Sequence, residues 1–135
     1  MNDDLARARE WARRLDVEDF ASLPELLAPD ALYRGPSGEM RGPDPIVASY
    51  RENAAWAHRT FDLITWGSEI ASRDDGRIEI TFEDRTTHRG VDHVYHCRQV
   101  LTFDGAGRIV EIEHVALPEE ERALAEFFRR VGVER

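Results

Sequence analysis

The stretch FDLITWGSEIASRDDGRIEITFEDRTTHRGVDHVYHCRQVLTFDGAGRIVEIEHVA, residues 61–116, decides the fold of this chain. It contains four runs that are typical of β-strands, at residues 61–72, 77–88, 92–103 and 108–116. Turn residues separate the runs, at Asp75–Gly76, at Arg89–Gly90 and in the segment 104–107. Because consecutive strands joined by short turns pair antiparallel, we expect these four runs to form one antiparallel sheet.

Helical patterns dominate the residues before this stretch. Apolar residues at steps of three and four predict an amphipathic helix over residues 3–15, and the pattern continues to about residue 28. Pro24 interrupts this continuation because an interior proline lacks the N–H that a helix needs. The spacing of Ser22 and Glu25 is that of a capping box, so the helix is expected to restart there.

The remaining segments complete the order of elements. Residues 31–34 are typical of a short strand, and residues 35–42 of a loop. Asp44 followed by Pro45 predicts a helix that runs to about His58. Pro118 opens a last helix, which Gly132 can end. Helices come early and strands run together, so the chain is predicted to be of the α+β class, with one domain over residues 1–135. A curved antiparallel sheet wrapped around the N-terminal helices is the simplest packing.

Composition narrows the classes of function. The net charge is -9 and all 18 basic residues are Arg, which disfavours nucleic-acid binding and excludes a lysine Schiff base. No apolar run approaches the roughly 20 residues that span a bilayer, and the N-terminus lacks the pattern of a signal peptide. Cys97 is the only cysteine, so no intrachain disulfide can form. We therefore expect a cytoplasmic protein with no membrane partner.

Three segments carry a resemblance to a known family. They are LAPDALY at residues 27–33, GPDPI at 42–46 and FDGAGRIV at 103–110. In their order and spacing the chain resembles the nuclear-transport-factor-2-like superfamily, and within it the SnoaL-like proteins. The resemblance implies a cone-shaped α+β barrel with a pocket between the helices and the concave face of the sheet. Many such proteins are cofactor-free lyases, isomerases or hydrolases and form dimers, whereas others only bind or scaffold, so the fold does not settle the function.

Strand alternation identifies polar residues on otherwise apolar faces. Asp84 continues the stripe of Ile78, Ile80 and Phe82, and His114 continues that of Val110 and Ile112. Gln99 shares a face with Tyr95, Cys97, Leu101 and Phe103. An unpaired polar group on an inner face costs on the order of 1–3 kcal/mol. We therefore expect Asp84 and His114 to contact one another inside the pocket, either as a catalytic pair or as a buried structural pair.

Two enzyme families of this superfamily offer residue-level matches. In ketosteroid isomerases the oxyanion tyrosine falls on Trp11, the general base on Gly35 and the second oxyanion acid on Gln99, while a supporting tyrosine falls on Tyr50. In limonene epoxide hydrolases one catalytic aspartate falls on Asp84 and the water-positioning tyrosine on Tyr33. Their arginine, asparagine and second aspartate fall on Phe82, Gly35 and His114. Both catalytic sets are thus changed here, whereas SnoaL-like polyketide cyclases commonly use His/Asp combinations.

These observations predict a cofactor-independent enzyme acting on a small, mostly apolar molecule, polyketide- or terpenoid-like. The reaction would be a proton transfer: cyclisation, dehydration, isomerisation or epoxide opening. The expected catalytic residues are His114 as acid/base, Asp84 as its orienter, and Tyr33 and Gln99 as oxyanion donors. The expected substrate-binding residues are Trp11, Tyr50, Phe82, Tyr95, Cys97, Leu101 and Ile112.

Several simpler interpretations stay open. Tyr33, Tyr50 and Trp11 can be core aromatics, and Gln99 can bond a neighbour. The protein can be a non-catalytic module that binds a small ligand or dimerises, or a stress or accessory domain with a vestigial pocket.

The histidines and the cysteine are not expected to add a further centre. His93 and His96 lie on opposite faces of a strand, and His88 does not converge with them, so we expect no metal. Cys97 lies among apolar residues, which disfavours a nucleophilic thiolate. We expect a homodimer joined through the outer face of the sheet, where Arg98, Val100 and Thr102 lie.

Overall fold

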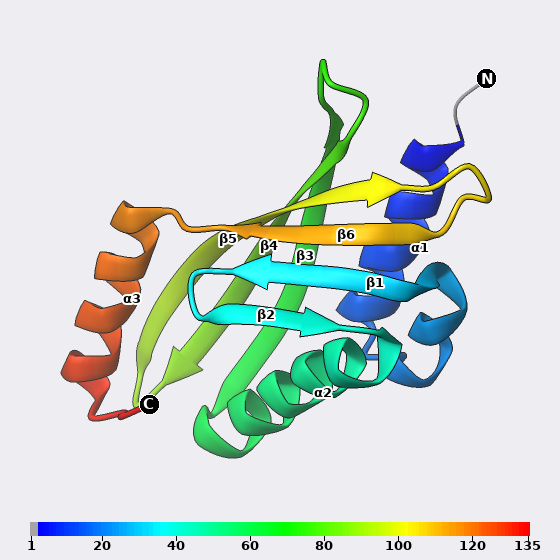
Figure 1. Ribbon diagram of the computed structural model, residues 1–135. Helices are drawn as coiled ribbons and strands as arrows, with labels where there is room; N and C mark the ends of the chain where they lie inside the picture. The colour runs from blue at the N-terminus through cyan, green and yellow to red at the C-terminus, as the bar shows by residue number, and fades with distance from the viewer. Residues whose placement is uncertain (1–2) are drawn as a thin grey trace.

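The computed structural model describes residues 3–135 and is of the α+β class, as predicted. Its elements in chain order are α1 (Asp4–Asp16), the 3-10 helix η1 (Phe20–Leu26), β1 (Leu27–Gly35), β2 (Gly38–Arg41), α2 (Pro43–Thr60), β3 (Leu63–Ser72), β4 (Ile78–His88), β5 (Val91–Phe103), β6 (Ile109–Val115) and α3 (Pro118–Val131). Figure 1 shows one curved sheet with α1 and α2 packed against it and α3 at the end where β5 and β4 meet. Within residues 3–135, no helix is long and apolar enough to cross a membrane.

The six strands form a single sheet in the order β2-β1-β6-β5-β4-β3. The four strands of the stretch 61–116 pair antiparallel in chain order, as predicted. Their register aligns Ile80 with Gln99 and Gln99 with His114, so these three residues form one row across the sheet. β1 pairs with β6 in parallel, so the sheet is antiparallel except at this one pair.

The region around β1 differs from the sequence prediction. The expected loop at 35–42 contains β2, which forms a hairpin with β1 and aligns Gly35 with Gly38. β1 starts at Leu27 rather than at residue 31, and its pairing with β6 shifts register between Leu27 and Leu32. Pro29 lies in that irregular part, where no ladder N–H is required of it.

The second predicted helix is instead the short η1. The capping box does not form, because Ser22 Oγ donates to Asp19 Oδ2 at 2.6 Å and the Glu25 carboxylate accepts from Arg14. Pro24 lies inside η1, where the tighter 3-10 turn accommodates it in place of a regular α-helix. The connection from α1 to β1 is therefore a compact corner rather than a second long helix.

Two apolar clusters hold the helices to the sheet. The larger joins α1 and η1 to the inner face of the sheet and includes Trp11, Leu23, Ile80 and Leu101, each fully buried. The smaller joins the C-terminal end of α2 to α3 and the start of β3, through Ala57, Phe61, Ile64, Phe127 and Val131. The concave face is thus filled at one end by α1 and covered at the other by α3.

Candidate functional site

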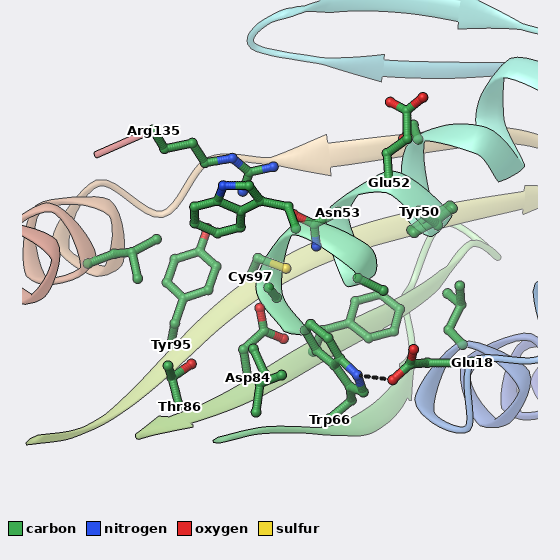
Figure 2. A pocket seen from close by; sticks show the side chains of 18 of the residues that line it. Glu18, Tyr50, Glu52, Asn53, Trp66, Asp84, Thr86, Tyr95, Cys97 and Arg135 are labelled. Carbon is green, nitrogen blue, oxygen red and sulfur yellow. Dashed lines mark hydrogen bonds between the residues drawn. The ribbon is translucent and has the colours of Figure 1, made fainter. Parts of the chain in front are cut away.

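A cavity of about 900 Å³ lies between the two apolar clusters. Its walls come from the inner face of the sheet, from α1 and η1, from α2 and from α3. Eight of the residues predicted from the sequence line it: Tyr33, Tyr50, Phe82, Asp84, Tyr95, Cys97, Gln99 and His114. In Figure 2, Asp84, Cys97 and Tyr95 rise from β4 and β5 into the same space. For the seven of these residues that lie on strands, the alternation therefore assigns the inner face correctly.

Three of the predicted substrate-binding residues do not line the cavity. Trp11, Leu101 and Ile112 are fully buried in the larger apolar cluster. Leu101 and Ile112 share the inner face with the lining residues, and Trp11 lies on α1, which packs against this end of the sheet in the larger cluster. The prediction that these three contact a ligand is therefore corrected: they are core residues.

Asp84 presents a carboxyl group to the cavity without a protein partner. Within residues 3–135 its carboxylate makes no hydrogen bond and no ion pair. Burial raises the pKa of Asp84 to about 7, the nearby Asp16 carboxylate raises it further, and His96 opposes the rise. Asp84 therefore changes its protonation state close to neutral pH.

Asp16 is a second acid of the cavity, and the sequence prediction missed it. It is the last residue of α1, and its Oδ2 accepts a hydrogen bond from Ser68 Oγ at 2.7 Å. Burial raises the pKa of Asp16, and the bond from Ser68 opposes the rise. The sequence contains the pattern that could have identified Asp16. Ala8, Ala12 and Asp16 are spaced four residues apart and therefore lie on one face of the helix.

The predicted contact between Asp84 and His114 is not formed. No hydrogen bond or ion pair joins them within residues 3–135. Asp84 aligns with Tyr95 on β5, whereas His114 aligns with Gln99, four residues further along the same strand. Four residues of extended chain span about 13 Å. The alternation placed both residues on the inner face, but it carries no information on how far apart along the sheet they lie.

Gln99 lies at the centre of a hydrogen-bond network on the other side of the cavity. Tyr50 Oη donates to Gln99 Oε1 at 2.6 Å. Gln99 Nε2 lies 3.4 Å from Tyr33 Oη and 3.4 Å from His114 Nδ1. Burial raises the pKa of Tyr33 to about 12 and that of Tyr50 well above its ordinary value. Burial also lowers the pKa of His114, so its imidazole is neutral at neutral pH.

Cys97 lies between these two polar groups, and Tyr95 is aligned with Asp84. Burial, followed by the charge of Asp84, raises the pKa of the Cys97 thiol to about 12, which disfavours a thiolate as the sequence predicted. Tyr95 Oη donates a short hydrogen bond to Glu121 Oε1 of α3. The hydroxyl proton of Tyr95 is therefore already used, and α3 is tied to the cavity wall.

Polar contacts also join the elements around the cavity. Glu18, at a positive φ of 59°, accepts from Trp66 Nε1 at 2.9 Å, as Figure 2 shows, and pairs with His58 Nε2 at 2.6 Å. This contact connects the end of α1 to β3 and to the C-terminal end of α2. The guanidinium of Arg135 lies 4.1 Å from the centre of the Trp56 ring, on the side of α3.

The remaining histidines lie apart from one another. His93 stacks on Phe127 of α3 at 4.9 Å between ring centres. The imidazole of His96 contacts Glu83 and Glu120, and His88 packs against Phe61. In the part of the chain that the structure describes, no three His, Cys, Asp or Glu side chains gather in a way that could hold a metal ion.

The sequence of this chain matches the model of a known protein family. A family model described as a SnoaL-like domain matches residues 8–112, which is most of the chain and includes most of α1, the sheet through β5 and the first part of β6. The chain belongs to the SnoaL-like domain family. Among curated proteins, none matches the sequence of this SnoaL-like domain.

Several solved structures have a fold similar to that of this SnoaL-like domain. An NTF2-like protein of unknown function from Burkholderia pseudomallei is 20% identical, with a TM-score of 0.68 over 97% of this chain and 98% of that one. A protein from Xanthomonas campestris assigned as a polyketide cyclase is 12% identical, with a TM-score of 0.65 over 89% and 97%. TerC, co-crystallised with polyporic acid, is 15% identical, with a TM-score of 0.65 over 93% and 99%. At these identities the likeness establishes a shared fold.

Proposed function

We propose that this SnoaL-like domain is a cofactor-independent enzyme that transfers a proton on a small, mostly apolar molecule of polyketide or terpenoid type. In this proposal Asp84 carries the proton. The family and the polyketide cyclases among the structures of similar fold support the class of substrate. The co-crystal of TerC with polyporic acid supports an aromatic ligand as a first candidate.

The single observation that carries the proposal is the state of Asp84. Its carboxyl group faces a cavity of about 900 Å³, has no hydrogen-bond partner within residues 3–135 and has a pKa of about 7. A group with such a pKa is ionised often enough to accept a proton and protonated often enough to return it. Asp16 supports this state because its negative charge disfavours a second ionised carboxylate nearby.

The chemistry follows from these two acids and the apolar walls. The ionised Asp84 removes a proton from a carbon that a carbonyl group activates, and the electron pair of the broken C–H bond moves towards the carbonyl oxygen. The protonated Asp84 then returns the proton, either to another carbon of the same intermediate or to a departing hydroxyl. The first outcome is an isomerisation and the second a dehydration. A cyclisation results when the enolate carbon instead attacks a second carbonyl carbon of the same molecule, and the protonated Asp84 gives its proton to the alkoxide that forms. Phe82 and Phe128 belong to the walls that exclude water during these steps.

This assignment reverses the roles predicted from the sequence. His114 was expected to be the acid/base and Asp84 its orienter, but the two are not in contact. The lowered pKa of His114 keeps it neutral, whereas Asp84 titrates near neutrality. We therefore assign proton transfer to Asp84 and treat His114 as part of the Gln99 network.

The test uses 2-tetralone, a bicyclic apolar ketone with acidic protons beside its carbonyl. Their exchange for deuterium in D2O is followed by proton NMR with the wild-type protein, Asp84→Asn and Asp74→Asn, a matched control in an exposed turn. We expect catalysed exchange that Asp84→Asn slows by about 100-fold or more and that Asp74→Asn leaves unchanged. Exchange that does not depend on Asp84, or that never exceeds the buffer rate, would contradict the proposal. Binding of 2-tetralone without any exchange would favour the non-catalytic ligand-binding module.

A further inference from the structure

Each of the two hydrogens on the amide nitrogen of Gln99 has a hydrogen-bond acceptor nearby. Gln99 is 4% exposed, and its side chain has one acceptor oxygen and one nitrogen with two hydrogens. Its Oε1 faces the Tyr50 hydroxyl at 2.6 Å, and its Nε2 faces Tyr33 Oη and His114 Nδ1, each at 3.4 Å. The two hydrogens on Nε2 can therefore be donated one to each of these two neighbours.

The buried Tyr50 hydroxyl fixes which way this amide points. Tyr50 Oη can donate its proton to Gln99 Oε1. If the amide were reversed, a nitrogen would face Tyr50, and the Tyr50 proton would have no acceptor in that contact. Leaving a buried donor unpaired is costly, so the orientation with Oε1 towards Tyr50 is favoured.

The orientation of Gln99 in turn determines the protons on its other two neighbours. Since Gln99 Nε2 donates to His114 Nδ1, that nitrogen is an acceptor, and a neutral His114 carries its proton on Nε2. Since Gln99 Nε2 also donates to Tyr33 Oη, the hydroxyl proton of Tyr33 is not used in that contact. Both residues line the main cavity and a smaller adjoining one of about 440 Å³.

We propose that Tyr33 Oη–H and His114 Nε2–H are two unused donors that bind a carbonyl or anionic oxygen of the ligand, with Gln99 as the positioning residue that aims both. The proposal rests on the proposed function for its ligand class: in a ligand that is conjugated between its two ends, the far oxygen held by these donors takes up negative charge when Asp84 removes a proton. It also changes two roles that the sequence predicted. Gln99 is not an oxyanion donor, because it has no hydrogen left for a ligand, and His114 is not the acid/base but donates a hydrogen bond to the ligand.

The position of the two donors on the sheet restricts the shape of the ligand. His114 aligns with Gln99 on β5 and Asp84 aligns with Tyr95, so His114 and the acid lie four residues apart along the sheet. Cys97 separates them, with a thiol whose pKa is raised to about 12 and which is therefore uncharged. A ligand that reaches both ends is elongated, with an acceptor oxygen at one end and the reacting carbon at the other. Conjugation through a fused-ring system can carry charge between such ends, which fits a molecule of at least two rings.

The first experiment reads the protonation of His114 directly. Nitrogen NMR of the free wild-type protein at pH 7.5 is expected to show a neutral imidazole with its proton on Nε2. Gln99→Glu replaces the donating nitrogen with a second acceptor oxygen, so the proton of His114 is expected to move to Nδ1. A proton on Nδ1 in the wild-type protein, or no change in Gln99→Glu, would overturn the assignment.

The second experiment measures binding and needs no turnover. 4-Nitrophenolate presents an anionic oxygen, whereas nitrobenzene lacks it, and calorimetry gives the dissociation constant of each. Tyr33→Phe is expected to weaken the phenolate by about 10-fold or more, because a hydrogen bond to a charged group is lost, and to leave nitrobenzene unchanged. Thr81→Val is the control, since it removes a hydroxyl from the opposite face of β4, outside the cavity. It is expected to leave both affinities unchanged.

The outcomes separate this proposal from the proposed function. If phenolate binding depends on Tyr33 and His114 carries its proton on Nε2, the donor site stands even where 2-tetralone shows no exchange. If Tyr33→Phe weakens the binding of 4-nitrophenolate and of nitrobenzene equally, or weakens the binding of neither, the donor site is refuted. This holds even where Asp84-dependent exchange is found. His114→Phe serves as a second donor variant in case Tyr33→Phe does not fold, with the same expected loss of phenolate binding.

Discussion

At the scale of single residues, the raised pKa of Asp84 determines how much the ionisation of this residue destabilises the folded protein. The folded protein binds the Asp84 proton more tightly than the unfolded chain does, because its pKa rises from the ordinary 3.8 to about 7. Well below pH 3.8 both states are protonated, and Asp84 does not destabilise the fold. As the pH rises from about 4 to 7, the unfolded chain ionises this carboxyl group while the folded protein still holds the proton, so the free energy of unfolding falls by up to about 4 kcal/mol and levels off above pH 7.

Asp84→Asn is therefore expected to stabilise the protein at pH 8, because an amide does not ionise. The gain in the free energy of unfolding should shrink as the pH falls from 7 to 4. Thermal melts of both proteins at pH 5 and pH 8 measure it, with Asp74→Asn as the exposed control. A gain of equal size at both pH values would show that the pKa of Asp84 is not raised by the fold.

Asp16 controls the pH at which Asp84 ionises. Its negative charge raises the pKa of Asp84, so Asp16→Asn is expected to lower that pKa. If the ionised Asp84 is the base, the rate of 2-tetralone exchange rises with pH through this pKa. The rise should therefore occur at lower pH in Asp16→Asn than in the wild type. A profile that does not move would contradict the coupling between the two acids.

The residues of the site could be predicted from the sequence only in part. Strand alternation placed Asp84, Gln99 and His114 on the inner face because side chains along a strand alternate strictly. It could not give their partners, because these depend on the register between strands and on the residues of α2, such as Tyr50. The same pattern could not tell that Leu101, two residues from Gln99, is packed inside the larger apolar cluster while Gln99 lines the cavity.

At the scale of elements, the end of α3 depends on one glycine. Gly132 follows the helix with φ at 75° in the left-handed region, and its N–H and that of Val133 satisfy carbonyls of the last turn. Gly132→Ala is expected to cost about 1–2 kcal/mol of unfolding free energy. A Cβ there would also lie 2.9 Å from the guanidinium of Arg89, which can move.

Gly105→Ala provides the control for that substitution. An added Cβ at Gly105 meets open space, and its φ is outside the left-handed region. Urea unfolding of the two variants compares them directly. Equal stability of both would show that the left-handed geometry at Gly132 is not required to end α3.

The elements that the sequence could predict are those with strong local signals. The four strands of residues 61–116 alternate regularly and are joined by glycine turns, so their pairing follows from short-range features alone. β2 has four residues, begins with Gly38 and is followed by Gly42. These glycines are typical of a loop, and the segment becomes a strand only because β1 offers a free edge. The parallel pairing of β1 with β6 brings together residues about eighty positions apart, and no local pattern encodes it.

At the scale of the whole molecule, the outer face of the sheet is covered by ion pairs. Arg34 pairs with Glu111 at 2.8 Å, and Arg77 pairs with Glu113 at 3.2 Å. Val100, which was expected to contribute to a dimer interface, is only 1% exposed and is already buried within one chain. The large apolar residues still exposed on this face are Leu63 of β3, at 58%, and Val94 of β5, at 40%.

A homodimer through the outer face of the sheet remains our prediction, centred now on Leu63 and Val94 rather than on Val100. Light scattering is expected to give twice the chain mass of 15.5 kDa. Each chain carries a net charge of -9, so the two copies repel one another, and added salt should strengthen the dimer by screening that repulsion. Val94→Asp places a further charge in the interface and is expected to give the monomer mass. Val17→Asp is the matched control, because Val17 is equally apolar and 60% exposed but lies at the end of α1, away from the sheet's outer face. A monomer in the wild type at all salt concentrations, or a dimer that Val94→Asp leaves intact, would move the interface elsewhere or remove it.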